Sequence, residues 1–307
     1  MNTLHLKYIV EVARTGSITI AAENLFMNQP NLSKAIKEFE MTIGINIFKR
    51  TSKGIFLTKK GEEFLGYAQN ILAQVEELET LYKPDKKNKI SFSVSVPRAS
   101  YIAHAFTVFV AKLDETKEWD MNFKETNSMQ TIEDVVEGEC RLGVIRYQKN
   151  YENYFLDFLK DKKLGHEEVW EFEYLVLMSE NNPLASLDTL SYHELSKCIE
   201  IVHGDLTVPH LSFAEKKKNE KHKKRRVYVY ERGSQLDLLN QIPNSYMWVS
   251  PLPQEQLKRY GLFQKRCSAA EQIYKDIIIY AKGYQLTEID KAFIQEINQV
   301  KDSICRA

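Results

Sequence analysis

Apolar positions in the first part of the chain recur with the period of short helices. Three successive runs, over residues 4–14, 17–27 and 28–43, place apolar side chains every three or four positions. The second run begins at Ser17 and the third at Asn28, and both residue types can cap a helix. The pattern predicts three short helices with a tight middle turn, which is typical of a helix-turn-helix.

A hairpin pattern follows the third predicted helix. Residues 45–58 carry β-branched and aromatic side chains on either side of Lys53 and Gly54. Such a segment predicts two short strands joined by a turn, with cationic residues near the tip. Because a hairpin in this position would be a wing, residues 1–57 are expected to form a winged helix-turn-helix.

A long helix is predicted next, because apolar positions from residue 58 to residue 82 step by alternating threes and fours, as in the seam of a coiled coil. The seam consists of Gly61, Phe64, Ala68, Ile71, Val75, Leu78 and Tyr82. A helix of about 25 residues would be ~37 Å long at ~1.5 Å rise per residue. Most apolar stripes only bury a helix against its own domain, but the length of this one, ahead of Pro84, favours the pairing of two copies. Residues 58–89 are therefore expected to form a dimerisation helix and a hinge.

Beyond residue 89 short strand-like runs alternate with helical patterns. The strand-like runs lie at 90–96, 141–147, 174–179, 199–204, 227–231, 246–251 and 275–282. Helical patterns between them include 103–113, 131–137, 191–197 and 234–241. This alternation predicts an α/β domain over residues 90–307, with ligands bound at strand ends.

Composition and charge narrow the class of protein. The chain has 307 residues, with 42 basic and 42 acidic side chains, so a nucleic-acid partner would need a local concentration of positive charge. The four cysteines are far apart and show neither metal-site nor disulfide spacing. Neither a signal peptide nor a membrane-spanning run is evident, which favours a cytoplasmic protein without membrane contact.

A set of core, turn and surface residues between positions 16 and 61 matches one known pattern. Its members are Gly16, Ser17, Ala21, Ala22, Glu23, Leu25, Gln29, Pro30, Leu32, Ser33, Ile36, Glu40, Gly44, Phe48, Arg50, Leu57, Thr58 and Gly61. In these residues the chain resembles the LysR-type family of bacterial transcription regulators. The resemblance implies a double-stranded operator DNA as partner, self-association into dimers and further into tetramers, a small-molecule effector, and RNA polymerase as a possible further partner.

The third helix and the wing supply candidate DNA contacts. The N-terminal part of that helix would enter a major groove, where amide side chains suit adenine and lysines suit guanine or phosphate. Wing cations suit phosphate or the minor groove. The helical candidates are Thr19, Asn28, Gln29, Pro30, Asn31, Ser33, Lys34 and Lys37. The wing candidates are Lys49, Arg50, Thr51 and Lys53, with Arg50 the foremost.

The C-terminal part resembles the effector domain of the same family, which is similar to type 2 periplasmic binding proteins. The resemblance implies two α/β lobes with a ligand cleft between them. We expect lobe I at about 90–162 and 267–307, and lobe II at about 163–266. Arg141 departs from the family, which commonly has an acidic residue before this strand, and the departure weakens any inference about ligand type.

Candidate effector contacts lie at the ends of the predicted strands. They are Pro97, Arg98, Ser100, Tyr101, Asn127, Ser128, Met129, Arg146, His203 and Gly204. Each residue alone is more often structural, but together they could line a cleft. Exposed amides and hydroxyls at a helix start favour an anion, so a small anionic metabolite is the expected effector.

Two further hypotheses remain open beside the regulator. No catalytic motif, metal-ligand spacing or phosphate-binding glycine loop is present, so neither enzymatic activity nor a metal or cofactor is expected. A solute-binding or catalytic domain with an autoregulatory DNA-binding head is the alternative, and a regulator with a vestigial cleft is another. The basic run 216–226 is expected to be a solvated surface segment, although a second DNA contact or an anion site is possible.

Overall fold

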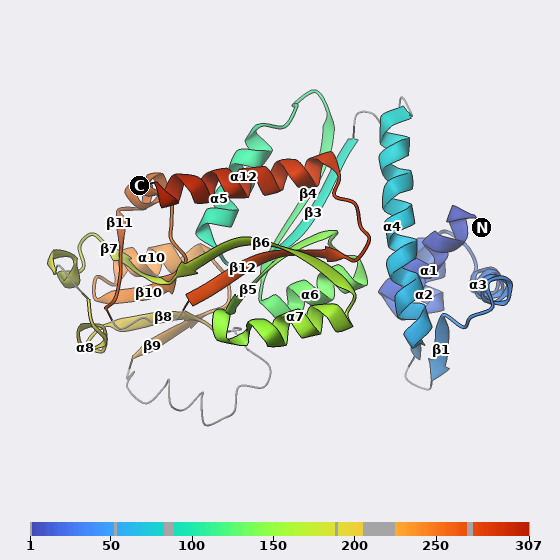
Figure 1. The fold of residues 1–307 in the computed structure, drawn as a ribbon, viewed down its shortest axis with the longest axis horizontal. Helices are drawn as coiled ribbons and strands as arrows, with labels where there is room; N and C mark the ends of the chain where they lie inside the picture. Colours follow the sequence, from blue (N-terminus) through green and yellow to red (C-terminus); the bar gives the residue numbers. More distant parts are fainter. Residues whose placement is uncertain are drawn as a thin grey trace.

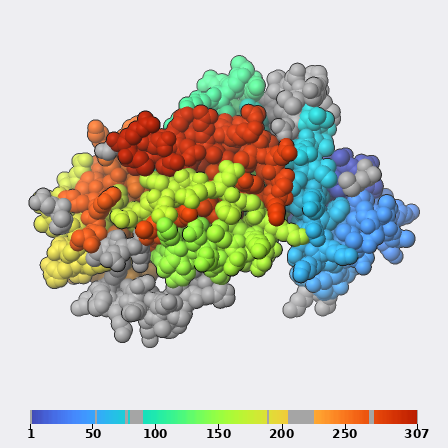
Figure 2. All heavy atoms as spheres, in the orientation of Figure 1, coloured from blue at the N-terminus to red at the C-terminus, as the bar shows by residue number. Residues whose placement is uncertain are grey.

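The computed structural model describes residues 2–51, 54–82, 89–187, 190–204, 225–268 and 273–306. A small helical head occupies one end of the molecule, and a two-lobed α/β domain forms the rest (Figures 1 and 2). One long helix, α4, stands between the head and the first lobe. The predicted fold class, a winged helix-turn-helix followed by a linker helix and an α/β domain with two lobes, is confirmed.

The head consists of three helices and a hairpin. Its elements are α1 (Thr3–Thr15), α2 (Ile18–Asn24), α3 (Gln29–Ile43), β1 (Phe48–Thr51) and β2 (Gly54–Leu57). The side chains of Ser17 and Asn28 cap α2 and α3 by accepting hydrogen bonds from Ile20 N and Asn31 N. Gly16 and Gly44 end α1 and α3 in the left-handed region, where a glycine costs least.

Helix α4 (Lys59–Tyr82) begins inside the head and continues past the first lobe. A side chain at Gly61 would place its Cβ only 2.0 Å from the carbonyl oxygen of Ile47, so glycine is needed for this close approach. Ala68 is buried in the head core, where Phe64 and Ile71 also pack. The first half of the predicted seam therefore stabilises the head itself and is not available to a partner.

The linker helix also contacts the first lobe. Asn70 Nδ2 donates to the carbonyl oxygen of Lys282 at 3.4 Å, and Glu63 forms an ion pair with Lys163 at 3.0 Å. These contacts place the head beside the lobe that carries the first and last segments of the α/β domain (Figure 1).

The first lobe is a five-stranded sheet covered on both faces. In spatial order its strands are β4 (Glu118–Thr126), β3 (Lys89–Pro97), β5 (Leu142–Gln148), β12 (Ile273–Ala281) and β6 (Leu164–Glu173). β3 is parallel to β4 and β5, and β12 is antiparallel to β5 and β6. Two apolar clusters fill the lobe: one takes in residues of α5 (Ser100–Ala111) and α12 (Glu288–Cys305), the other residues of α6 (Ser128–Glu137) and α7 (Glu152–Asp161). A short 3-10 helix, Lys149–Tyr151, precedes α7.

The second lobe has its own five-stranded sheet and core. In spatial order the strands are β11 (Leu262–Lys265), β7 (Leu175–Ser179), β10 (Ser245–Val249), β8 (Ile199–His203) and β9 (Arg226–Val229). The described helices of this lobe are the 3-10 turn Pro183–Ser186, α8 (Tyr192–Leu195), α10 (Gly233–Gln241) and α11 (Gln254–Tyr260). β8 is parallel to β9 and β10, whereas β7 is antiparallel to β10 and β11.

The chain passes between the lobes later than the sequence predicts. Strand β6 pairs antiparallel with β12 along its whole length, so residues 164–173 belong to the first lobe. The expected crossing near residue 163 is wrong, and the chain crosses at Tyr174. It returns before Ile273, because Cys267 still bridges to Leu190 of the second lobe. The polar sequence LGHEEVWEFE conceals this strand, since only Leu164, Val169 and Phe172 are buried in it.

Candidate DNA-binding surface and effector cleft

The recognition helix α3 separates a buried face from an exposed one. Leu32, Ile36 and Phe39 anchor the helix in the core, and each is at most 5% exposed. On the other side the candidate DNA contacts Gln29, Asn31, Lys34 and Lys37 are exposed; Asn28 and Pro30 at the helix start and Thr19 on α2 are also exposed, and Ser33 is half-buried. This arrangement presents amides and cations from the first turns of one helix, as a groove-binding helix requires.

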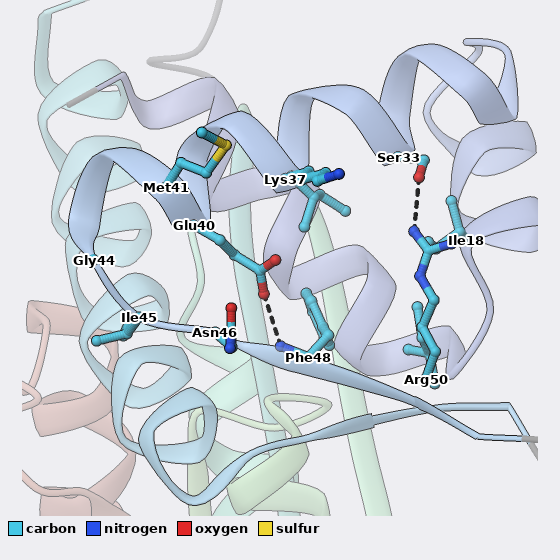
Figure 3. A pocket seen from close by; sticks show the side chains of 12 residues that line it. Ile18, Ser33, Lys37, Glu40, Met41, Gly44, Ile45, Asn46, Phe48 and Arg50 are labelled. Atoms are coloured by element: carbon cyan, nitrogen blue, oxygen red, sulfur yellow. Dashed lines mark hydrogen bonds between the residues drawn. The ribbon is translucent and has the colours of Figure 1, made fainter.

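The wing is tied to the recognition helix by two side chains. Arg50 Nη2 on β1 donates to Ser33 Oγ on α3 at 2.7 Å (Figure 3). Glu40 Oε1 accepts from the backbone N–H groups of Ile47 and Phe48 at 2.6 and 2.9 Å, which fixes the base of the wing. A hollow of about 620 Å³ between α3 and the wing is lined by Ser33, Lys37, Glu40 and Arg50, among others.

The described wing candidates lie on one exposed strand. Lys49, Arg50 and Thr51 are all exposed on β1, and Lys53 lies outside the described residues. Lys34 is 3.9 Å from Glu38 one turn along α3, a solvent-exposed pair that restrains the lysine little. The structure therefore brings the helix candidates and the described wing candidates together on one end of the head.

Arg146, a predicted effector contact, forms a buried ion pair with Asp276. Its Nε and Nη2 atoms donate to the two carboxylate oxygens of Asp276 at 2.7 and 2.6 Å, and the side chain of Asp276 is fully buried. Burial alone would lower the pKa of Arg146, but the Asp276 carboxylate reverses this effect and raises it. The guanidinium also lies 4.8 Å from the centre of the Phe172 ring.

Two other predicted effector contacts pack around this pair. Tyr101 is fully buried, and its hydroxyl donates to Asp276 Oδ2 at 2.6 Å. Burial and the neighbouring Asp276 raise the pKa of Tyr101. Ser128 Oγ donates to the carbonyl oxygen of Arg146 at 2.7 Å and accepts from its N–H at 3.0 Å. These placements favour a positioning role for both residues.

The same network reaches the two chain crossings. Tyr174 lies at the first crossing and Tyr274 just after the second, and their rings stack with centroids 3.8 Å apart. Gln148 Nε2 donates to the hydroxyl of Tyr274 at 3.0 Å, and Arg146 Nη1 donates to that of Tyr174 at 3.5 Å. The hinge between the lobes is therefore a stacked tyrosine pair held by side chains of β5.

Other predicted cleft residues have local roles. Asn127 caps α6 by accepting from Gln130 N, and Met129 packs partly buried against the second core cluster of the first lobe. Pro97 is buried at the end of β3. His203 ends β8, and a Cβ at the adjacent Gly204 would lie 2.5 Å from the ring of Tyr230. These residues lie at strand or helix ends, as the sequence predicts, and their contact with an effector stays a prediction.

Arginines from both lobes bridge the gap between them. Arg98 Nη2 donates to the carbonyl oxygen of Tyr230 at 2.8 Å, and Ser100 Oγ accepts from Arg232 Nη2 at 2.8 Å. Arg232 also pairs with Glu125 at the end of β4. The sequence indicates Arg98 and Ser100 as candidates but not Arg232 or Glu125, because no local motif marks either of the last two residues.

Most of the basic run 216–226 lies outside the described residues. Its last member, Arg226, begins β9 and forms an ion pair with Glu200 at 3.0 Å. No helix in the described part of the chain is long and apolar enough to span a membrane. The arrangement as a whole defines a class of protein that joins a winged helix-turn-helix head to a two-lobed α/β domain.

Comparisons with known proteins name the family. The model of the bacterial regulatory helix-turn-helix protein, lysR family, matches residues 4–62. The HTH-type transcriptional regulator YnfL of Escherichia coli K12 is 26% identical over 198 residues, which cover 63% of this chain and 62% of YnfL. The chain thus spans about three fifths of the length of this curated relative. The chain therefore carries the DNA-binding domain of the LysR-type family over residues 4–62.

Solved structures share the whole fold at low sequence identity. ArgP from Mycobacterium tuberculosis superposes with a TM-score of 0.64 and 15% identity, covering 99% of this chain and 98% of ArgP. The full-length LysR-type regulator LysG from Corynebacterium glutamicum, with its effector arginine bound, has a TM-score of 0.61 and 12% identity, covering 97% of this chain and 99% of LysG. These likenesses show a common fold for head, linker helix and α/β domain.

Proposed function

We propose that this protein is a sequence-specific DNA-binding transcription regulator whose activity is modulated by a small anionic effector. The observation that carries the proposal is the joint surface of α3 and the wing. There Arg50 contacts Ser33 at 2.7 Å, and the exposed lysines of α3 and the wing share one end of the head. Its site of action would be operator DNA in the bacterial cytoplasm.

The recognition helix and the wing would have different tasks at DNA. Gln29 and Asn31 on the first turn of α3 can form paired hydrogen bonds to adenine edges in the major groove. Lys49 and Arg50 on the wing would contact phosphates, which adds affinity with little base discrimination. The Arg50–Ser33 hydrogen bond would keep the wing and the helix in one register on the duplex.

A dimer would present two such heads to two half-sites. The outer face of α4 supports this proposal, because Tyr67 and Leu78 lie about three turns apart on one side of the helix and are 62% and 59% exposed. Exposed large apolar side chains on a linker helix favour a partner helix. Assembly into a tetramer and contact with RNA polymerase are further parts of the regulator hypothesis.

An effector would act by favouring one arrangement of the two lobes. The lobes are joined at the stacked Tyr174–Tyr274 hinge and through the arginines at the gap. Only a ligand that binds one arrangement more tightly than the other can shift their populations. We propose that such a shift reaches the head through α4, which contacts the first lobe at Lys282 and Lys163.

The experiment that tests DNA recognition is selection of duplexes from a random pool. We expect the full chain to enrich an interrupted palindrome. Gln29→Ala should change the base preference within each half-site, whereas Arg50→Ala should weaken binding to all duplexes and reduce the slope of log affinity against log salt by about one. Lys258→Ala, which removes an exposed lysine from α11 in the second lobe, is the matched control and should change neither.

The enzyme hypothesis makes a different prediction. A catalytic domain with an autoregulatory head would turn over its substrate after deletion of residues 1–89. Such turnover, combined with the absence of any enriched duplex, would replace the regulator proposal.

A further inference from the structure

Three turns of the first lobe contact the linker helix α4 (Figure 1). At the turn that ends α6, a Cβ at Gly138 would lie 2.0 Å from Gln69 Nε2, so the Gln69 side chain fits only because residue 138 is a glycine. At the turn after β12, the carbonyl oxygen of Lys282 accepts from the buried Asn70 at 3.4 Å. Two neighbouring residues of α4 therefore place polar side chains directly on the lobe.

Lys163, in the third turn, has a backbone conformation that favours glycine. Its φ is 56°, which costs a lysine free energy that a glycine would not lose. The side chain of Lys163 pairs with Glu63 of α4 at 3.0 Å, and its carbonyl oxygen accepts from Lys282 N at 2.9 Å. A strained residue points to a task for its side chain, and the task of this side chain is contact with α4.

The polar contacts between α4 and the lobe are weak. The side chains of Glu63 and Lys163 are each 52% exposed, so water and salt screen their attraction. The 3.4 Å hydrogen bond of Asn70 is long. Gln69 Nε2 is buried without an acceptor among the residues that the structure describes, which disfavours the docked arrangement. The lobe can therefore separate from the helix while its own core stays intact.

The same three turns lie at one end of strands β5, β6 and β12, and the hinge between the lobes lies at the other end. There the rings of Tyr174 and Tyr274 stack, and Gln148 at the end of β5 donates to the hydroxyl of Tyr274. Because β12 pairs with β5 and with β6 along its length, the three strands form one continuous body. A change at the hinge therefore reaches the contact with α4 through a single part of the sheet.

We propose that the contact of Glu63, Gln69 and Asn70 with these three turns is a reversible latch between the linker helix and the first lobe. When the latch is closed, the head has one position relative to the lobe; when it is open, the head is free to take another. The proposal rests on the proposed regulator and names the step that carries its signal. An effector that binds one arrangement of the lobes more tightly would change the fraction of chains in which the latch is closed.

Distances between two spin labels would measure this fraction in the full chain. One label is attached to α4 through Lys60→Cys and the other to α7 through Lys160→Cys, since both lysines are exposed. Cys305→Ser removes the exposed native thiol, and the other three cysteines are buried. An excess of unlabelled wild-type chain restricts the signal to label pairs within one chain, and pulsed electron paramagnetic resonance gives the distribution of distances.

A methyl group at position 138 should open the latch. We expect Gly138→Ala to raise the fraction of long distances by about fivefold or more, because the added Cβ meets the Gln69 amide. Gln69→Ala in the same chain removes that collision and should restore the wild-type distribution. The matched control is Gly261→Ala, at a helix-ending glycine with a φ of 61° and no described atom within 4 Å of the added Cβ. It introduces similar backbone strain and should leave the distances unchanged.

Charge reversal tests the same latch at its third turn. Lys163→Glu places two carboxylates together and should lengthen the distances, and Glu63→Lys in the same chain should shorten them again. Lys291→Glu reverses an exposed pair elsewhere in the first lobe and should change nothing. Tyr174→Ala removes the stacked pair at the far end of β6 and should shift the same distribution if the sheet carries the signal.

An unchanged distribution in both Gly138→Ala and Lys163→Glu would overturn the latch, as would failure of Gln69→Ala to reverse the effect of Gly138→Ala. An unchanged distribution in Tyr174→Ala would overturn its coupling to the hinge. Circular dichroism melting of each variant establishes beforehand that it is folded. Binding of the wild type to the enriched duplex separates the two claims: intact binding with unchanged distances in the variants refutes only the latch, whereas failure to bind any duplex refutes the proposed regulator.

Discussion

Removal of the Arg146 guanidinium should destabilise the α/β domain far more than loss of a surface charge. Arg146→Met keeps a long apolar side chain but leaves the carboxylate of Asp276, which is fully buried, without its bidentate partner. Breaking a buried ion pair in this way costs about 3–5 kcal/mol of unfolding free energy. The hydroxyl of Tyr101 still donates to Asp276, so we expect a loss near the lower end of that range.

Urea denaturation followed by tryptophan fluorescence measures this loss. Trp170 lies edge-on to Tyr101 with ring centroids 5.1 Å apart, so its emission reports on the affected lobe. The control is Lys291→Met, which breaks an exposed pair with Glu288 and should cost at most about 0.5 kcal/mol. The double variant Arg146→Met with Asp276→Asn removes both charges and should be more stable than Arg146→Met alone. The Arg146–Asp276 pair would not be a main stabilising contact of the domain if Arg146→Met lost less than about 1 kcal/mol of unfolding free energy. The same conclusion would follow if the double variant were no more stable than Arg146→Met.

Three further predictions concern the head, the first lobe and the linker helix. Phe26 is 98% exposed and has a φ of 53°, a backbone conformation that favours glycine. Phe26→Gly should relieve this strain without loss of packing and stabilise the head by about 0.5–1 kcal/mol. A lower melting temperature of the variant would contradict this. Asp134 is buried with Lys124 at 2.7 Å, and although burial opposes it, the hydrogen bonds from Lys124, Gln130 and Ser95 lower its pKa. The stabilising effect of the Asp134 carboxylate is present above the ordinary aspartate pKa and is lost as pH falls through the lowered pKa. Lys124→Ala should therefore move the midpoint of acid unfolding to higher pH. An unchanged midpoint would count against a stabilising role of the Lys124–Asp134 pair. Leu78→Asp should weaken dimerisation at least tenfold in sedimentation equilibrium, and an unaltered dimer would exclude this face of α4.

The head could be predicted from sequence because its signals are local. Ser17 and Asn28 cap the helices that follow them, and Gly16 and Gly44 end helices as their types suggest. Helix spacing and caps act over a few residues, so they are readable without tertiary information.

The linker seam shows where such local reading fails. The alternating threes and fours of α4 are real, but the close approach of Gly61 to Ile47 assigns the first half of the seam to the head core. A stripe of apolar residues has the same pattern whether it packs on its own domain or on a second copy. Only the tertiary structure separates the two uses.

The candidate effector site was the least predictable part of the molecule. Its candidates lie at strand and helix ends as expected, but the partner of Arg146 is Asp276, far along the chain, and no local pattern predicts that pairing. Arg232 and Glu125 come together only because the two lobes meet there. Contacts of this kind depend on the topology of the fold. The lobe boundary was also predicted too early in the chain, because strand β6 has a polar sequence and was not recognised as a strand of the first lobe.

The central claim is that the head reads specific DNA, and a comparison of two duplexes tests it most directly. Fluorescence anisotropy at 0.15 M salt would measure the dissociation constants of the full chain for the enriched duplex and for a duplex of the same length and composition with scrambled sequence. We expect a preference for the enriched duplex of about 10³-fold or more, as sequence-specific regulators show. Equal affinities for the two duplexes would contradict it.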